Sequence, residues 1–98
     1  MLWLSQSVIV VLIGFSAPTP TASCTYTQVD THYETTVTWS GFSATSLEVF
    51  NGSAPLVQSQ FAHQMRSGNL TFSLNSGPTT AQVAGPKIGV RVPCNAAP

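Results

Sequence analysis

The stretch that decides the fold is VDTHYETTVTWS at residues 29–40, where two kinds of side chain alternate along the chain. The odd positions hold its apolar residues, ending in Val37 and Trp39, whereas the even positions are all polar. An alternation with a period of two is typical of a β-strand that has one face in the core and the other in water. We therefore predict a strand from Val29 to Ser40, with Trp39 as the central aromatic residue of the core.

Shorter segments of the same kind fill the rest of the chain, and none has the apolar spacing of a helix. The expected strands, besides the first, are residues 24–28, 46–50, 56–61, 70–74, 80–83 and 88–92. Asn51-Gly52 between two apolar runs predicts a hairpin. Further breaks are expected at the Gly- or Pro-containing residues 40–41, 67–69, 76–78 and 85–86.

Short strands at regular intervals predict an all-β fold. The expected architecture is a small antiparallel β-sandwich of six or seven strands, with an immunoglobulin-like or fibronectin-like topology. A small β-barrel is the alternative.

The composition limits the choice of partner. The chain has 98 residues, enough for one domain, and only three acids and three bases, which give a net charge of zero. Nucleic acid is therefore excluded as a partner, because its phosphates require clustered Lys and Arg. Ser and Thr fill 24 positions, so hydroxyl groups supply most of the polarity.

The first 23 residues are interpreted as a signal peptide followed by a linker. The apolar run at residues 8–13 has the length of a signal-peptide core and is too short for a membrane span, which takes about 20 apolar residues. Small residues allow cleavage after Ser16 or after Ser23, and both sites remain open. The protein is expected to be secreted, with a single domain at residues 24–98.

Two cysteines, Cys24 and Cys94, bracket this expected domain. In an oxidising compartment each is the partner of the other, so we predict a disulfide bond between them. A bond that closes a loop of roughly 71 residues stabilises the fold by about 4 kcal/mol in the chain-entropy model.

The polar face of the first strand holds the weak candidates for metal binding, Asp30, His32 and Glu34. Imidazole and carboxylate groups at alternate strand positions can ligate a divalent ion. A solvated strand face is the preferred interpretation, and no cofactor is expected. The acids can also form ion pairs with the last strand, Asp30 with Arg91 and Glu34 with Lys87, in a single antiparallel register.

No catalytic residue is predicted. The chain has three carboxylates, whereas a glycosidase needs two of them placed across a cleft. A Gly-x-Ser-x-Gly elbow, which would mark a serine hydrolase, is absent from the sequence. The lone His63 is interpreted as a surface loop residue.

Two acceptor patterns for N-glycosylation begin at Asn51 and Asn69. Asn51 belongs to the predicted hairpin tip, and Asn69 precedes a predicted strand, so both are expected at the surface. Glycans there would supply the solubility that the missing charges do not.

Four segments carry a resemblance to a known family. They are Val37-Thr38-Trp39-Ser40-Gly41, Leu47-Glu48-Val49-Phe50, Ser67-Gly68-Asn69-Leu70-Thr71-Phe72 and Ile88-Gly89-Val90-Arg91-Val92. Residues 37–92 thus resemble the immunoglobulin-like N-terminal domain of fungal Ser/Thr-rich, often GPI-anchored cell-surface proteins, related to yeast cell-wall glucan-synthesis proteins. The resemblance implies a wall-associated, non-catalytic role and carries over no binding residue.

The sequence therefore predicts a small secreted, non-enzymatic β-sandwich module that binds an extracellular protein, polysaccharide or surface, in a fungal cell wall or facing a host. A structural or adhesive surface component is the first alternative, because a low charge permits self-association. A small metal-binding or hydrolytic enzyme is the second alternative.

Overall fold

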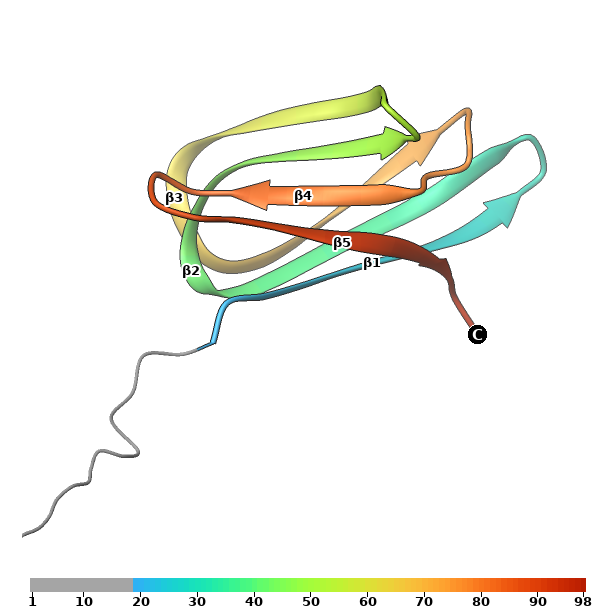
Figure 1. Ribbon diagram of the computed structural model, residues 1–98. Helices are drawn as coiled ribbons and strands as arrows, with labels where there is room; N and C mark the ends of the chain where they lie inside the picture. Colours follow the sequence, from blue (N-terminus) through green and yellow to red (C-terminus); the bar gives the residue numbers. More distant parts are fainter. Residues whose placement is uncertain (1–18) are drawn as a thin grey trace, which may run out of the picture.

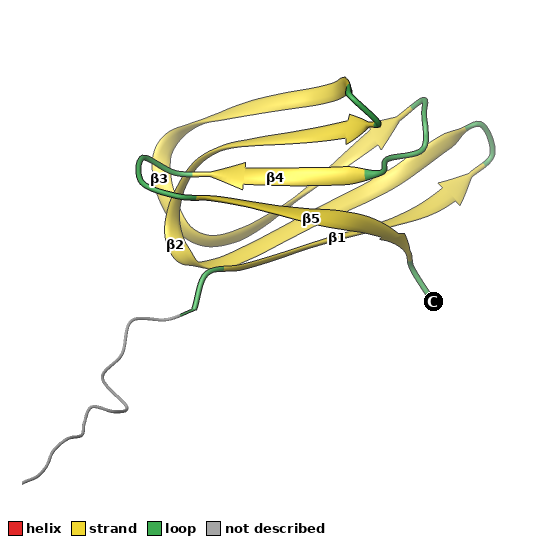
Figure 2. Cartoon of the chain, viewed as in Figure 1, coloured by secondary structure: helices red, strands yellow, loops and turns green. Residues whose placement is uncertain are grey.

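The computed structural model describes residues 19–98, and most of them lie in five β-strands (Figure 1). The strands are β1 (Thr21–Val29), β2 (His32–Asn51), β3 (Ala54–Leu74), β4 (Thr80–Ala84) and β5 (Gly89–Ala96). Figure 2 shows strands joined by short loops and no helix in this part of the chain, so the all-β prediction is confirmed. The expected signal-peptide core lies outside the described residues.

The two long strands each bend and contribute to two layers of the fold. The first half of β2, residues 32–40, lies between β1 and the second half of β3. The second half of β2, residues 46–51, lies between β4 and the first half of β3. In Figure 1 both strands turn together at the left of the molecule, where the pairing register also shifts.

The layers join through a parallel pairing of β1 with β5. Strands β1, β5, β4 and β2 thereby close into a small barrel, and β3 is added outside β2. The predicted sandwich of six or seven strands is therefore wrong in strand number and in closure. The alternative of a small β-barrel describes the four closed strands better.

The error in strand number has a physical cause, because two expected breaks lie within continuous strands. Gly41 adopts a φ of +88°, a left-handed conformation that glycine tolerates, and β2 continues through it. Gly68 lies opposite Trp39 in β3, and a Cβ atom there would come within 2.9 Å of the indole ring. Glycine is thus needed at Gly68 for close packing and does not end the strand.

The core lies between the layers and is centred on Trp39, as predicted. The indole is 1% exposed, stacks on Phe61 with ring centroids 5.2 Å apart, and donates a hydrogen bond of 3.1 Å to the Met65 carbonyl. The other buried apolar residues are Cys24, Val37, Phe42, Ala44, Leu47, Val49, Leu74, Ala81 and Val83. Trp39 therefore ties the first half of β2 to the bend of β3.

The disulfide bond between Cys24 and Cys94 is confirmed. The two residues are direct partners in the β1–β5 pairing, with Cα atoms 4.5 Å apart, and Cys24 is buried. The bond therefore fastens the barrel where its first and last strands meet.

Both hairpins in β1–β3 use two-residue loops. The one predicted at Asn51-Gly52 is confirmed, with Gly52 at a φ of +62°. The other was not predicted: Asp30 takes a φ of +56° and separates β1 from β2. The prediction of one strand from Val29 to Ser40 is therefore wrong at its start, because Val29 ends β1 and β2 begins at His32.

Candidate functional site: a hydroxyl face on β1, β2 and β3

One outer surface of the barrel carries hydroxyl groups in rows. It is formed by β1, the first half of β2 and the second half of β3, where alternate residues point away from the core. We define the hydroxyl face as twelve outward positions in four cross-strand rows, Thr21–Ser40–Ser67, Ser23–Thr38–Asn69, Thr25–Thr36–Thr71 and Thr27–Glu34–Ser73.

The composition of the hydroxyl face differs from that of the whole chain. Ten of its twelve positions are Ser or Thr, against 24 of 98 in the sequence. The other two are Asn69 and Glu34, so this face holds a single ionisable side chain. All twelve side chains are exposed or half-buried, and they are therefore accessible to a ligand.

Local sequence explains how the hydroxyl face forms. Each strand alternates hydroxyl residues with residues that enter the core, as in Thr36-Val37-Thr38. Threonine is β-branched and suits the pleated surface of a strand, and paired threonines across strands stabilise a sheet. The Cys24 disulfide lies directly beneath, between the outward residues Ser23 and Thr25. The disulfide therefore fastens β1, one of the three strands that form the face, to β5.

The rows form a regular grid of hydrogen-bonding groups. Neighbouring strands lie about 4.8 Å apart, and successive outward residues of one strand about 6.7 Å apart. Two pairs of hydroxyl oxygens are already bonded at 2.9 Å, Thr21 to Ser40 and Thr36 to Thr71. A hydroxyl has one donor and two acceptor sites, so even these pairs retain capacity for a ligand.

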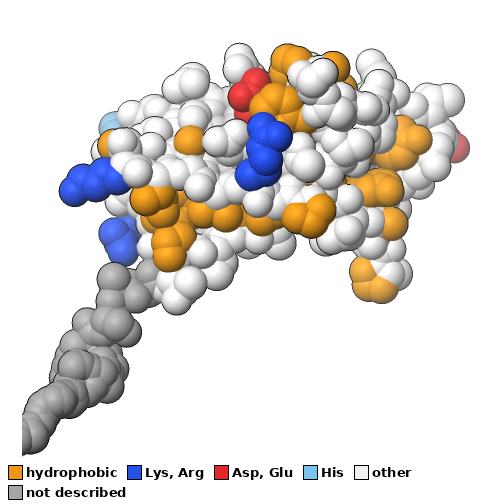
Figure 3. Space-filling model, in the orientation of Figure 1, with side chains coloured by type: hydrophobic (Ala, Val, Ile, Leu, Met, Phe, Trp, Pro, Cys, Tyr) orange, Lys and Arg blue, Asp and Glu red, His pale blue; other side chains and the backbone are white. Residues whose placement is uncertain are grey.

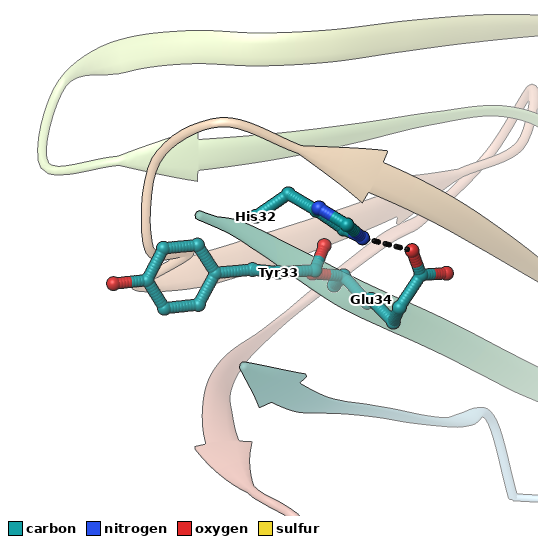
Figure 4. Close-up of polar contacts among 4 residues, drawn as sticks. His32, Tyr33 and Glu34 are labelled. Atoms are coloured by element: carbon teal, nitrogen blue, oxygen red, sulfur yellow. Dashed lines mark hydrogen bonds and ion pairs between the residues drawn. The ribbon is translucent and has the colours of Figure 1, made fainter. Parts of the chain in front are cut away.

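The weak metal candidates lie at one end of this face. Figure 4 shows His32 and Glu34 pointing toward each other on one side of β2, with Nε2 and Oε2 3.1 Å apart, while Tyr33 points away. The prediction that Asp30 shares this strand face with them is wrong, because Asp30 lies in the turn before β2. Among the described residues, no group of three or more His, Cys, Asp or Glu could hold a metal ion.

The predicted ion pairs between the first and last strands do not form. Strand β5 pairs with β4 and β1 and not with the first half of β2. Arg91 instead donates a hydrogen bond of 3.3 Å to Gln82 and lies 4.6 Å from the centre of the Phe50 ring. Lys87 lies in the loop between β4 and β5.

The opposite outer surface is chemically mixed. One row across β3, β2, β4 and β5 reads Gln58–Glu48–Gln82–Arg91. In Figure 3 an acidic and a basic side chain lie close together beside hydrophobic groups on the side that carries β4 and β5. Gln58 donates a hydrogen bond of 2.8 Å to Glu48, so the polar groups here already bond to one another.

A hollow of about 510 Å³ lies near the bend of the long strands. Its lining is mainly apolar or uncharged, and Lys87 is its one charged residue. No carboxylate, histidine or cysteine is among the described residues that line it.

The remaining sequence-predicted residues lie at the surface. Asn51 is exposed at the end of β2, and its side-chain amide donates a hydrogen bond of 2.9 Å to the Gly77 carbonyl. Asn69 is exposed on the hydroxyl face itself. His63 is exposed, but it lies in β3 and not in a loop.

Comparisons with known proteins add no assignment. No family model matches the chain, and no significantly similar protein was found among curated proteins or solved structures. The described chain contains no helix capable of crossing a bilayer.

Sequence reasoning missed the hydroxyl face, although each of its strands is visible in the sequence. Thr25-Tyr26-Thr27 and Thr36-Val37-Thr38 place hydroxyls on alternate positions. The missing information was the register, which sets Thr25, Thr36 and Thr71 side by side.

Proposed function

We propose that the protein is an extracellular, non-enzymatic binding module whose hydroxyl face docks on a flat, uncharged polysaccharide surface. The observation that carries this proposal is the grid itself, in which ten of twelve outward residues are Ser or Thr. Sugar hydroxyls are likewise both donors and acceptors, so each contact can exchange a bond to water for a bond across the interface.

The scarcity of charge favours a neutral partner. In soluble proteins about a quarter of residues are charged, whereas only one of the twelve positions of the hydroxyl face holds a charged residue. A charged side chain buried against a neutral surface loses its hydration without gaining a partner, which costs far more than burying a hydroxyl that finds a hydrogen bond. The low charge is a property of the whole chain, with three acids and three bases in 98 residues, and the hydroxyl face shares it.

The shape of the face favours a surface over a single sugar. Three paired strands form a sheet without walls, and the hollow near Phe42 and Lys87 is lined by residues outside the twelve positions. Binding sites for small ligands are concave and bury most of the ligand. A sheet with repeated rows suits an extended partner with a repeat of its own.

The disulfide bond supports an extracellular location, because such bonds persist in oxidising compartments. We infer that the signal peptide is cleaved after Ser16. Cleavage after Ser23 would remove Thr21–Ser23 from β1, where these residues pair with Thr38–Ser40 of β2 and complete two rows of the hydroxyl face.

The two glycosylation sequons have different consequences under this proposal. A glycan on Asn51 would extend from a hairpin tip, away from the hydroxyl face. A glycan on Asn69 would cover the second row of the face. We expect protein that carries a glycan at Asn69 to lose polysaccharide binding and protein glycosylated only at Asn51 to retain it. The resemblance to fungal cell-surface domains remains a prediction, and a cell-wall polysaccharide would agree with it.

The direct test is co-sedimentation of the disulfide-bonded, glycan-free protein with insoluble cellulose, chitin and β-glucan. We expect binding to at least one of them, unchanged between low and high salt, because no ion pair contributes. Absence of binding to all three would contradict the proposal. Thermal hysteresis of the protein solution without polysaccharide binding would also contradict the proposal, because it would show that the hydroxyl face binds ice instead.

A further inference from the structure

The outer edge of β3 has no partner among residues 19–98. Strand β3 pairs with β2 alone, along both of its halves, whereas each of the other four described strands has at least two neighbours. In Figure 1, β3 follows β2 around the bend with no further strand beyond it. An unpaired edge presents a row of backbone N–H and C=O groups that can bind another strand.

The second half of this edge lacks the usual protection. Natural edge strands are blocked by charged side chains, proline, bulges or shortness. Residues 68–74 read GNLTFSL, without a charge or a proline, and pair with β2 in one continuous register from Tyr33–Leu74 to Trp39–Gly68. The one charge of β3 is Arg66, which precedes this segment.

We propose that residues 68–74 of β3 pair antiparallel with the same residues of a second copy of this chain. A second copy suits the edge because the segment is uncharged and the net charge of the protein is zero, so copies do not repel one another. The same segment on both partners gives a two-fold symmetric contact, which closes as a dimer. The contact pairs the 68–74 edge of each copy, so this segment is no longer free to bind a third copy.

The register follows from the alternation of side chains. Directly opposed residues in an antiparallel pair point to the same side of the sheet. The pairing is centred on Thr71, which is the midpoint of the segment, so Thr71 lies opposite its own counterpart and Asn69 lies opposite Ser73 of the second copy. Leu70 and Phe72 are half-buried in a single chain, and Leu70 then lies opposite Phe72 of the second copy on the inner side.

The dimer would join two hydroxyl faces into one. Because the two-fold axis is perpendicular to the sheet, both faces point the same way and form a six-stranded surface of twenty-four positions, twice the twelve of one chain. One face measures about 10 by 20 Å from strand geometry, which is small for stable binding. This consequence rests on the proposed function: two linked faces would bind an extended partner with an avidity of about 10²–10⁴ over one.

The test measures the mass of the disulfide-bonded, glycan-free protein by analytical ultracentrifugation over a concentration series. We expect a monomer–dimer equilibrium for the native sequence and a monomer for Thr71→Lys, because two lysines would oppose each other at the centre of the contact. The matched control is Thr25→Lys, which changes the same row on β1 and should dimerise normally. Melting curves verify that both variants fold.

A mixing experiment makes the test specific to the register. Thr71→Asp alone should also be monomeric, whereas a mixture of Thr71→Asp with Thr71→Lys should form heterodimers, because opposite charges then face each other. A native protein that stays monomeric to its solubility limit, equal loss of dimer in Thr25→Lys, a mixture that does not associate, or growth beyond a dimer would overturn the proposal.

The outcomes separate this proposal from the proposed function. A dimer that binds no polysaccharide would contradict the function and leave the β3 contact standing. A monomer that binds polysaccharide would support the function and contradict the contact.

Discussion

The two outer surfaces of this barrel are built on the same bent strands, yet they differ in chemistry. The hydroxyl face holds one ionisable residue, Glu34, among twelve positions. The opposite surface places Glu48 and Arg91 in a single row, where each bonds to a neighbouring glutamine. The charged groups of the second surface thus bond within the protein, whereas the first surface presents mainly uncharged hydroxyl groups. The comparison teaches that one fold can carry two surfaces of different chemistry.

The largest expected effect comes from Trp39, because both surfaces depend on the core between them. Trp39→Ala should lower the free energy of unfolding by about 3–5 kcal/mol, as truncation of a large buried aromatic does. Thermal melting checks this, with His32→Ala as a control that should melt close to the native protein. A Trp39→Ala protein with native stability would refute the assignment of inner and outer faces.

Removal of the disulfide bond should have the next largest effect. Replacing both Cys24 and Cys94 by Ser should destabilise the fold by about 2–5 kcal/mol, because the bond fastens β1 to β5. Chemical denaturation measures the loss. Since Cys24 lies beneath the hydroxyl face, polysaccharide binding by the double variant should fall in proportion to its unfolded fraction. Binding should recover at lower temperature, where more of the variant is folded. A double variant as stable as the native protein would contradict this account.

The smallest expected effect is that of replacing Glu34, a change that would increase the difference in charge between the two surfaces. Glu34→Gln removes the only ionisable group of the hydroxyl face and its contact with His32. Surface pairs of this kind contribute about 0–1 kcal/mol, so melting should change little. Binding to polysaccharide should be equal or stronger, and a clear loss of binding would show that the carboxylate takes part.

The sequence could predict the features that depend on neighbours along the chain. The alternation in residues 33–39 placed Trp39 in the core because a strand turns successive side chains to opposite sides. The disulfide followed from having two cysteines. By contrast, the Gly-containing breaks expected at residues 40–41 and 67–69 proved to lie inside continuous strands, because glycine is compatible with either a turn or a strand. Contacts such as Trp39 with Gly68 decide between them, and these join residues far apart in sequence.

The candidate site shows the same limit. Hydroxyl residues alternate in three separate stretches, and each stretch alone is ordinary for a strand. Only the pairing of β1 with β2 and of β2 with β3 turns them into a grid. Topology of this kind depends on how the chain closes, here through the parallel contact of β1 with β5, which no local pattern encodes.

The most direct measurement of the central claim compares two single-lysine variants in binding to an insoluble polysaccharide. Thr38→Lys places a charge on the central strand of the hydroxyl face, whereas Gln60→Lys places the same charge on the outer side of the other layer. Both positions are exposed, so both variants should fold. We predict at least about tenfold weaker binding, or about 1.4 kcal/mol, for Thr38→Lys and native affinity for Gln60→Lys. Native affinity for Thr38→Lys, or an equal loss in both variants, would contradict the account.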